Sequence, residues 1–235
     1  MNKEWVEAMI PIADKIRRYH KHRVVGIKSI PKKGAAIIAC NHSLATYDMM
    51  LLMSAIVTRT KRYPRSLIDR AFYKVPYLST VMENFGGIQG THDNAHEILE
   101  KGDLLYIAPG GMKESLKPHQ KKYTIQWEKR KGFAKLAIDT QTPIILAACP
   151  KADDIYKVYD SKLSKLVYEN FKMPFFFASG LRGTPLPKPI QLSHYLSEPI
   201  KPPKKPRAKT KYNDAVDKFH EVLEDKMKEL MEKGA

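Results

Sequence analysis

The sequence predicts an α/β fold in which helices flank a mostly parallel central sheet. Short apolar runs of strand length alternate along the chain with segments whose apolar residues recur at helical spacing. Two of these runs end in a polar or glycine-containing turn, which is typical of strands whose carboxyl ends border a ligand site. The length of 235 residues and the hydrophobic content of 43% indicate one globular domain with a substantial core.

The first segment predicts an amphipathic helix. Its apolar residues recur at helical spacing and form one stripe: Trp5, Met9, Ile12, Ile16 and Tyr19. Pro11 lies within this pattern and is expected to kink the helix. A tryptophan and a basic end are typical of helices that lie in a membrane interface, but the same stripe is consistent with packing on a protein core. Both interpretations stay open.

Strands and helices are then expected to alternate from residue 35 onward. The expected strands are 35–40, 65–68, 86–88, 103–107 and 143–149. The expected helices are 47–57, 77–84, 92–100 and 127–139. Beyond residue 150, we expect a helix over 153–168 and late strands over 173–178 and 188–196.

The C-terminal part predicts a stiff linker followed by a helix. Three prolines make residues 201–211 an exposed linker. The helix after it has an apolar stripe, and Asn213 is the expected cap; the stripe comprises Val216, Phe219, Leu223, Met227 and Leu230. The predicted organisation is a membrane-associating amphipathic helix at 1–29, a central domain at 30–200, and a basic proline-rich linker with a C-terminal helix at 201–235.

The net charge of +16 is concentrated in three segments. Residues 1–34, 113–135 and 201–211 each carry a surplus of six basic residues over acidic ones. Clusters of this kind favour a polyanionic partner, which is a nucleic acid, an anionic membrane surface or a phosphate-bearing substrate.

Cysteine usage and hydropathy predict the cellular compartment of the protein and its relation to a membrane. Cys40 and Cys149 lie in apolar runs without a C-x-x-C pair, so we expect buried thiols and a reducing compartment. The N-terminus lacks a signal-peptide pattern, and the longest mainly apolar stretch, 44–57, is shorter than a membrane span. We therefore expect no transmembrane segment and a peripheral location on the cytoplasmic face of a membrane.

The segment from Asn41 to Asp48 is the first candidate site, because it directly follows the strand predicted over 35–40. A histidine at a strand end, His42, can act as a base, and the carboxylate of Asp48 can fix its tautomer and stabilise the imidazolium. This pair is a catalytic triad without its nucleophile, so the substrate is expected to supply the attacking hydroxyl. A purely structural histidine is the alternative.

The second candidate site follows the strand predicted over 103–107. Adjacent glycines let backbone N–H groups approach a ligand closely, which favours an oxyanion or phosphate site, although a tight turn has the same pattern. The residues of this turn are Pro109, Gly110, Gly111, Met112, Lys113 and Glu114.

Together, these residues resemble the phospholipid/glycerol acyltransferase superfamily, which includes the lysophospholipid acyltransferases. The resemblance covers roughly residues 30–180 and includes segments 69–76, 85–91, 130–134 and 138–145. The five residues between His42 and Asp48 are similar to the spacing in the branch that contains transmembrane protein 68 and, more distantly, diacylglycerol acyltransferase 2.

The resemblance implies an acyltransferase domain over residues 30–200. Its reaction moves a fatty acyl group from acyl-CoA or acyl-carrier protein to a hydroxyl of a membrane glycerolipid, either a lysophospholipid of phospholipid biosynthesis or a mono- or diacylglycerol, without a cofactor. His42 is the implied general base, oriented by Asp48, and residues 143–145 are implied to lie near the acyl pocket. The implied substrate-binding residues are Asn41, Arg70, Pro109, Gly110, Gly111, Lys113 and Glu114.

The chain departs from the commonest superfamily pattern where an acceptor phosphate is held. Gly110 replaces a glutamate, Lys113 replaces an arginine, and segment 86–90 lacks the usual arginine. These departures favour a neutral acceptor such as monoacylglycerol over lysophosphatidic acid, unless Lys113, Arg70 or Arg182 compensates.

Other functions have weaker support. The sequence contains no G-x-S-x-G, P-loop or G-x-G-x-x-G motif, which argues against serine hydrolase and nucleotide chemistry. His92 and His96 have helical metal-ligand spacing but no evident third ligand, so we expect no metal. Nucleic-acid binding would leave His42 and Asp48 without a role and is not expected. A non-catalytic binding protein of the same fold is the alternative, and the oligomeric state is not predicted.

Overall fold

The structure is a computed structural model that describes residues 1–69, 73, 77–159 and 177–233. Its main sheet has the strand order β1-β9-β6-β2-β5-β3-β4, and every neighbouring pair is parallel except β6 and β9. The strands are β1 Arg23–Val25, β2 Ala36–Cys40, β3 Arg65–Ile68, β4 Gly87–Gln89, β5 Leu104–Ile107, β6 Ile144–Ala148 and β9 Ser193–Leu196. The predicted mostly parallel sheet is thereby confirmed.

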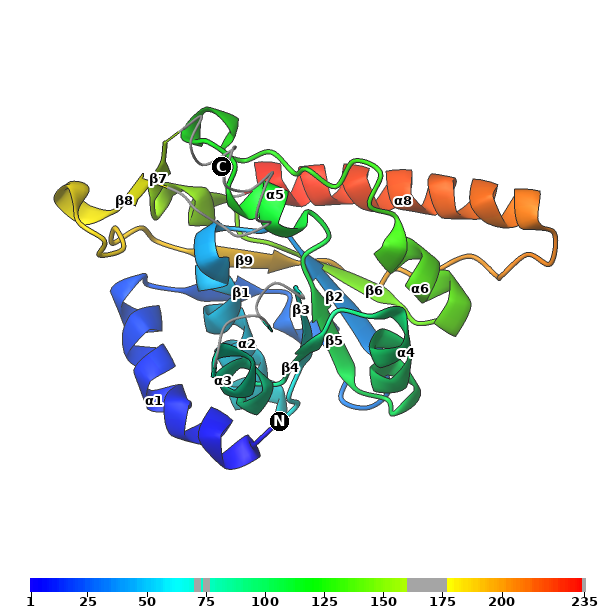
Figure 1. Ribbon diagram of the computed structural model, residues 1–235, viewed down its shortest axis with the longest axis horizontal. Helices are drawn as coiled ribbons and strands as arrows, with labels where there is room; N and C mark the ends of the chain where they lie inside the picture. The colour runs from blue at the N-terminus through cyan, green and yellow to red at the C-terminus, as the bar shows by residue number, and fades with distance from the viewer. Residues whose placement is uncertain (70–72, 74–76, 160–176, 234–235) are drawn as a thin grey trace.

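Helices cover both faces of this sheet (Figure 1). They are α1 Lys3–Tyr19, α2 Tyr47–Thr60, α3 Leu78–Asn84, α4 His92–Glu100, α5 Gly111–Ser115, α6 Gly132–Thr140 and α8 Lys209–Glu232. Strands β2, β5 and β6 are buried at every residue because they are covered on both sides, which explains their continuous apolar runs. Alternate side chains of β2 enter two cores: Ile37 packs with α4, α6 and α8, and Ile38 packs with α2.

The two terminal helices differ in how they use their apolar stripes. All five stripe residues predicted for α8 are buried against the sheet and α6, but the helix begins at Lys209, so Asn213 lies inside it and is not its cap. Helix α1 is continuous across Pro11, lies beside α2 and α3, and has no buried residue. In the described part of the chain, none of the helices is long and apolar enough to cross a membrane.

Several elements differ from their predicted extent. The helix predicted over 127–139 begins only at Gly132, and residues 150–154 form the 3-10 helix η5 instead of the start of a longer helix. A two-stranded sheet of β7 Lys157–Val158 and β8 Ala178–Ser179 follows η5. The remainder of the predicted helix and strand, 160–168 and 173–176, lies outside the described residues. The strand predicted over 188–196 is shorter in the structure, where β9 comprises Ser193–Leu196.

Strand β1 was not predicted, because three residues with mostly exposed side chains carry no readable period. It pairs in parallel with β9, so a strand from residues 1–29 and a strand from the late part of the chain together form one edge of the sheet. This pairing places the segments around His22 and His194 side by side.

Candidate active site

The two candidate segments meet at one edge of the sheet. Strands β2 and β5 are parallel neighbours, so the residues that follow each of them emerge at the same edge. A direct contact joins the segments: the backbone N–H of His42 donates to Oε1 of Glu114 over 2.8 Å. The two segments that the sequence analysis placed at the carboxyl ends of strands are therefore in direct contact.

Glu114 anchors two backbone segments. Its side chain is fully buried, and its second oxygen, Oε2, accepts from the N–H of Gln126 over 3.0 Å. Burial raises the pKa of Glu114, and the nearby positive charge of Lys117 opposes this rise. Glycine is required at position 110, because a Cβ there would lie 1.7 Å from Oε2 of Glu114. The geometry places Glu114 as a support for the His42 backbone.

The imidazole of His42 has a defined tautomer. Its Nδ1 lies 3.0 Å from the carbonyl oxygen of Ser43, and a carbonyl only accepts, so Nδ1 carries the proton. Nε2 therefore presents a lone pair and has no hydrogen-bond partner among the described residues. Burial lowers the pKa of His42, which favours the neutral ring that a general base needs.

Asp48 does not make the contact that the resemblance implies. Its Oδ1 accepts from the hydroxyl of Ser43, and its Oδ2 lies 3.3 Å from Nε2 of His194. Within the described part of the chain it makes no hydrogen bond to His42, so the Ser43 carbonyl orients that ring. Asp48 acts on His42 through its charge, which raises the pKa of His42 against the effect of burial.

The Asp48 carboxylate remains ionised although it is 1% exposed. Burial alone raises its pKa, but His194, Ser43 and the charge of His42 together hold the pKa below its ordinary value. Ser43 lies within the predicted segment, so its polar side chain was a usable signal. His194 comes from β9, and no spacing rule connects it to Asp48.

Three of the remaining residues predicted to bind substrate, Asn41, Lys113 and Gly111, are engaged by other parts of the protein. Asn41 is buried and pairs with the backbone of Cys149, its Oδ1 accepting over 2.8 Å and its Nδ2 donating over 3.3 Å. Lys113 is exposed and forms an ion pair with Glu128 at 2.5 Å. Gly111 lines the cavity described below, but its N–H donates to the carbonyl of Ala108.

Three further predictions concern residues away from these contacts. Pro109 is half-buried between β5 and α5. Arg70 lies outside the described residues. Residues 143–145 stand at the amino end of β6, where Ile144 pairs with Ile37, so they lie at the edge of the sheet opposite His42 and line none of the cavities described below.

His42 opens onto a cavity of about 720 Å³. The cavity lies between α2, β3, β5 and α5, and its wall includes Met49, Ile68, Tyr106 and Met112. An apolar groove of about 400 Å³ between α1, α2 and α3 shares five wall residues with it, so the two spaces adjoin. Among the described residues that line either space, the only charged side chain is Asp69.

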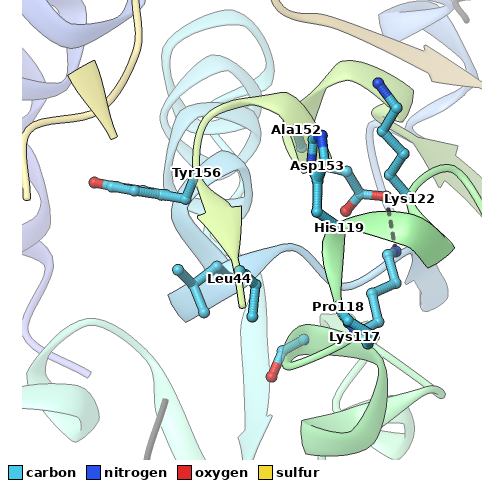
Figure 2. Close-up of a pocket in the computed structure, with 10 residues that line it drawn as sticks. Leu44, Lys117, Pro118, His119, Lys122, Ala152, Asp153 and Tyr156 are labelled. Atoms are coloured by element: carbon cyan, nitrogen blue, oxygen red, sulfur yellow. Dashed lines mark ion pairs between the residues drawn. The ribbon is translucent and has the colours of Figure 1, made fainter. Parts of the chain in front are cut away.

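A buried ion pair that the sequence did not reveal supports the segment after α5. Figure 2 shows the ammonium of Lys117 directed at the carboxylate of Asp153, and the two groups lie 2.9 Å apart. Asp153 also accepts from the N–H of Tyr123 over 2.7 Å, and Lys117 donates to the carbonyl of Thr124. These contacts hold the chain between α5 and α6 against η5, beside the Ser115 wall of the cavity.

Among the residues that the structure describes, two groups of donor side chains lie close enough together to be considered for a metal. His92 and His96 approach Asp139 on α6, which the sequence analysis did not identify as a third ligand. Asp48, Cys149 and His194 form the other group. In both groups the carboxylate already has protein partners, since Asp139 contacts Lys205 and Tyr212 and Asp48 contacts Ser43 and His194.

Known proteins share this sequence and architecture. A family model described as Acyltransferase matches residues 21–149. A bovine (Bos taurus) protein named "DGAT1/2-independent enzyme synthesizing storage lipids" is 33% identical over 183 residues, which are 77% of this chain and 53% of that protein. The human (Homo sapiens) protein of the same name is 32% identical over 183 residues, 77% and 54% of the two chains. The chain thus spans about half the length of the curated relatives it matches.

A solved structure has a similar fold. It is the 1-acyl-sn-glycerophosphate (LPA) acyltransferase PlsC from Thermotoga maritima, with a TM-score of 0.59 and 14% sequence identity over 96% of this chain and 79% of that chain. The family model covers more than half of the described chain and includes His42, Asp48 and Glu114. The resemblance inferred from the sequence is confirmed, and the chain belongs to the acyltransferase family.

Proposed function

We propose that the protein is an O-acyltransferase that moves a fatty acyl group from a thioester donor, acyl-CoA or acyl-carrier protein, to a hydroxyl of a glycerolipid. One observation carries the proposal: His42, whose Nδ1 is engaged by the Ser43 carbonyl so that Nε2 is left unprotonated, lines a large, mostly apolar cavity. A base at such a position can activate an alcohol, and the cavity has room for acyl chains. Membership of the acyltransferase family supports the same reaction class.

In the proposed reaction, Nε2 of His42 removes the proton from the acceptor hydroxyl as its oxygen attacks the thioester carbonyl. The tetrahedral intermediate collapses with cleavage of the carbon–sulfur bond, and the imidazolium returns the proton to the departing thiolate. The negative charge of Asp48 stabilises the imidazolium between these two steps. The acyl group passes directly to the acceptor, so no covalent enzyme intermediate is needed.

The cavity favours a neutral acceptor such as monoacylglycerol. Its described wall contains no lysine or arginine, and Lys113 forms an ion pair with Glu128 outside it. A lysophosphatidic acid phosphate would therefore meet no cation from the described wall, which is unfavourable for a buried anion. The relatives named for synthesis of storage lipids support the same acceptor class.

We also propose that the protein binds the membrane surface peripherally through α1. Trp5 is 48% exposed, and Met9 and Ile12 on the same helix are exposed as well. The apolar groove beside α1 adjoins the cavity that His42 lines, which supports delivery of a lipid from this surface to the base. The net charge of +16 supports attraction to anionic lipid.

An assay of acyl transfer tests the reaction. Purified protein is incubated with labelled acyl-CoA or acyl-carrier protein and with monoacylglycerol, diacylglycerol or lysophosphatidic acid in mixed micelles. Monoacylglycerol is expected to be the better acceptor, and His42→Gln is expected to lower kcat about 10²–10⁴-fold because a general base is lost. The matched control is His92→Gln, an exposed histidine on α4 that lines neither space.

Full transfer by His42→Gln would refute the base assignment. Absence of transfer to every acceptor would favour the non-catalytic alternative, in which the cavity only binds lipid. Preference for lysophosphatidic acid would refute the argument from the uncharged cavity wall.

Vesicle sedimentation tests the membrane proposal. Binding is expected to require anionic lipid and to weaken with salt, because exposed charges are screened within about 8 Å at physiological ionic strength. Trp5→Ser is expected to weaken binding, whereas Leu186→Ser, which alters an exposed apolar residue far along the chain, is the matched control. Equal binding to neutral vesicles at high salt would contradict the electrostatic contribution.

A further inference from the structure

A line of polar side chains, half-buried at Arg17 and His22 and fully buried at His194, leads from helix α1 to Asp48. Nε of Arg17 donates to Nδ1 of His22 over 3.1 Å. Nε2 of His22 lies 2.8 Å from Nδ1 of His194, and Nε2 of His194 lies 3.3 Å from Oδ2 of Asp48. The line exists because β1 and β9 are parallel neighbours, which brings the residue before β1 next to the middle of β9 (Figure 1).

The proton positions along this line follow from its first member. A guanidinium only donates, so Nδ1 of His22 accepts and Nε2 of His22 carries the proton. That N–H points at Nδ1 of His194, which must accept in turn. A neutral His194 therefore carries its proton on Nε2, directed at Asp48. The charge of Arg17 thus sets the tautomers of both histidines.

The contact between His194 and Asp48, at the inner end of this line, involves two atoms that lack other hydrogen-bond partners among the described residues. Nε2 of His194 and Oδ2 of Asp48 are both buried, and in the described structure neither atom makes a hydrogen bond of good geometry, so each is the nearest available partner of the other. The contact between them is long and imperfectly aligned, as catalytic hydrogen bonds often are before substrate binds. Without this N–H, the Ser43 hydroxyl would be the one described donor left to the buried Asp48 carboxylate, which is unfavourable for its ionised form.

The other groups around Asp48 carry no compensating positive charge. The titratable and charged groups that face it are Cys40 and His42 from the end of β2, Tyr106 from β5, Cys149 and Asp153 from β6 and η5, and His194 from β9. Burial raises the pKa of both thiols and of the phenol, so they are neutral, and Asp153 is paired with Lys117. The described donors that reach Asp48 come from Ser43 and His194.

We propose that His194, aligned by His22 and Arg17, is a positioning residue that keeps Asp48 ionised beside His42. The inference rests on the proposed acyl transfer, in which the charge of Asp48 stabilises the His42 imidazolium. His194 touches neither the cavity nor the reacting atoms. It acts on the reaction through the Asp48 carboxylate.

Nuclear magnetic resonance of the full chain with ¹⁵N-labelled histidine tests the proton arrangement without an activity assay. At neutral pH, His22 is expected to be neutral with its proton on Nε2, and Nε2 of His194 is expected to carry a proton, as assigned by comparing His22→Gln and His194→Gln spectra with the wild type. Burial, then nearby charges, lower the pKa of His22 to about 2, so its signal should not titrate above pH 4. A His194 ring with its proton on Nδ1 and none on Nε2 would overturn the proposal.

The pH profile of kcat tests the positioning role. Gln reaches the Nε2 position of a histidine with an amide donor, whereas Leu has none, so His194→Gln is expected to retain the wild-type profile. In His194→Leu, the acidic limb is expected to move up by about one pH unit or more, which is about a tenfold loss of kcat well below the midpoint of the limb and no loss well above it. The matched control is His220→Gln, since His220 is equally buried but packs beside Trp127 and Phe133.

A loss of kcat by His194→Leu that is equal at every pH would show a merely structural role and overturn the proposal. Failure of His194→Gln to restore the profile would overturn it as well. If the wild-type chain transfers no acyl group, the proposed function fails. The histidine tautomers seen by magnetic resonance then still decide whether the line of side chains from Arg17 to Asp48 has the proposed proton positions.

Discussion

Replacement of Glu114 separates two roles for this residue. The resemblance implies that it binds substrate, but the structure shows its two oxygens on the backbone N–H groups of His42 and Gln126 at 2.8 and 3.0 Å. Glu114→Ala would leave both donors buried without a partner. Each such donor costs about 1–3 kcal/mol, so the free energy of unfolding should fall by about 2–6 kcal/mol, with a further loss from the cavity that the shorter side chain leaves.

A conservative variant refines this estimate. Glu114→Gln keeps one oxygen acceptor but presents an amide N–H₂ to the other donor, so its expected loss is about 1–3 kcal/mol. Lys113→Ala, at the adjacent exposed position, removes a surface ion pair and is expected to change stability by less than about 1 kcal/mol. Urea unfolding at constant m-value measures all three variants.

Activity should fall in the same order as stability. Loss of the Glu114 contact frees the backbone that positions the His42 ring, and a displacement of about 1 Å at a reacting group can lower kcat about 10²-fold. The expected change is in kcat, with little change in KM for the acceptor. A Glu114→Ala variant of wild-type stability that only raises KM for the acceptor would refute this reasoning and favour direct substrate binding.

Three further predictions concern packing and protonation. His22→Gln should make the free energy of unfolding less dependent on pH. Below pH 6.5 the unfolded state takes up a proton on His22 and the native state does not, because the native pKa is about 2. In urea titrations between pH 6.5 and 4.5, the wild-type chain should therefore lose up to about 2.7 kcal/mol more of its unfolding free energy than the variant. Lys117→Met should destabilise the fold by about 3–5 kcal/mol by leaving Asp153 unpaired, and adding Asp153→Asn should recover most of this loss in calorimetry. Gly110→Ala should lower both stability and kcat because its Cβ would overlap the carboxylate below it, whereas Gly132→Ala, with no atom within 4 Å of its Cβ, should leave both unchanged.

The regular elements that border the site were readable from the sequence because their signals are local. Strand β3 and helix α4 have the predicted bounds, and β2 and β5 differ by one residue at their amino ends. Burial on both faces produces a continuous apolar run, and amphipathic packing produces a helical period within one segment. Because the carboxyl ends of parallel strands lie at one edge of a sheet, the sequence also predicted that the segment of His42 lies near the segment of Gly110 and Glu114, as it does.

The sequence by itself therefore determined the fold class, the family and the histidine that we propose as the base. The tertiary structure decided what each polar side chain contacts. Glu114 supports the His42 backbone, the Ser43 carbonyl orients the ring, and Asp48 turns to His194 from the far end of the chain. Side-chain periodicity reports only which face of an element is buried, whereas hydrogen bonds are made between elements whose spacing is set by sheet order. For that reason the contact of Asp48 with His194 depends on β9 lying beside β6 in the sheet, which no local pattern reports.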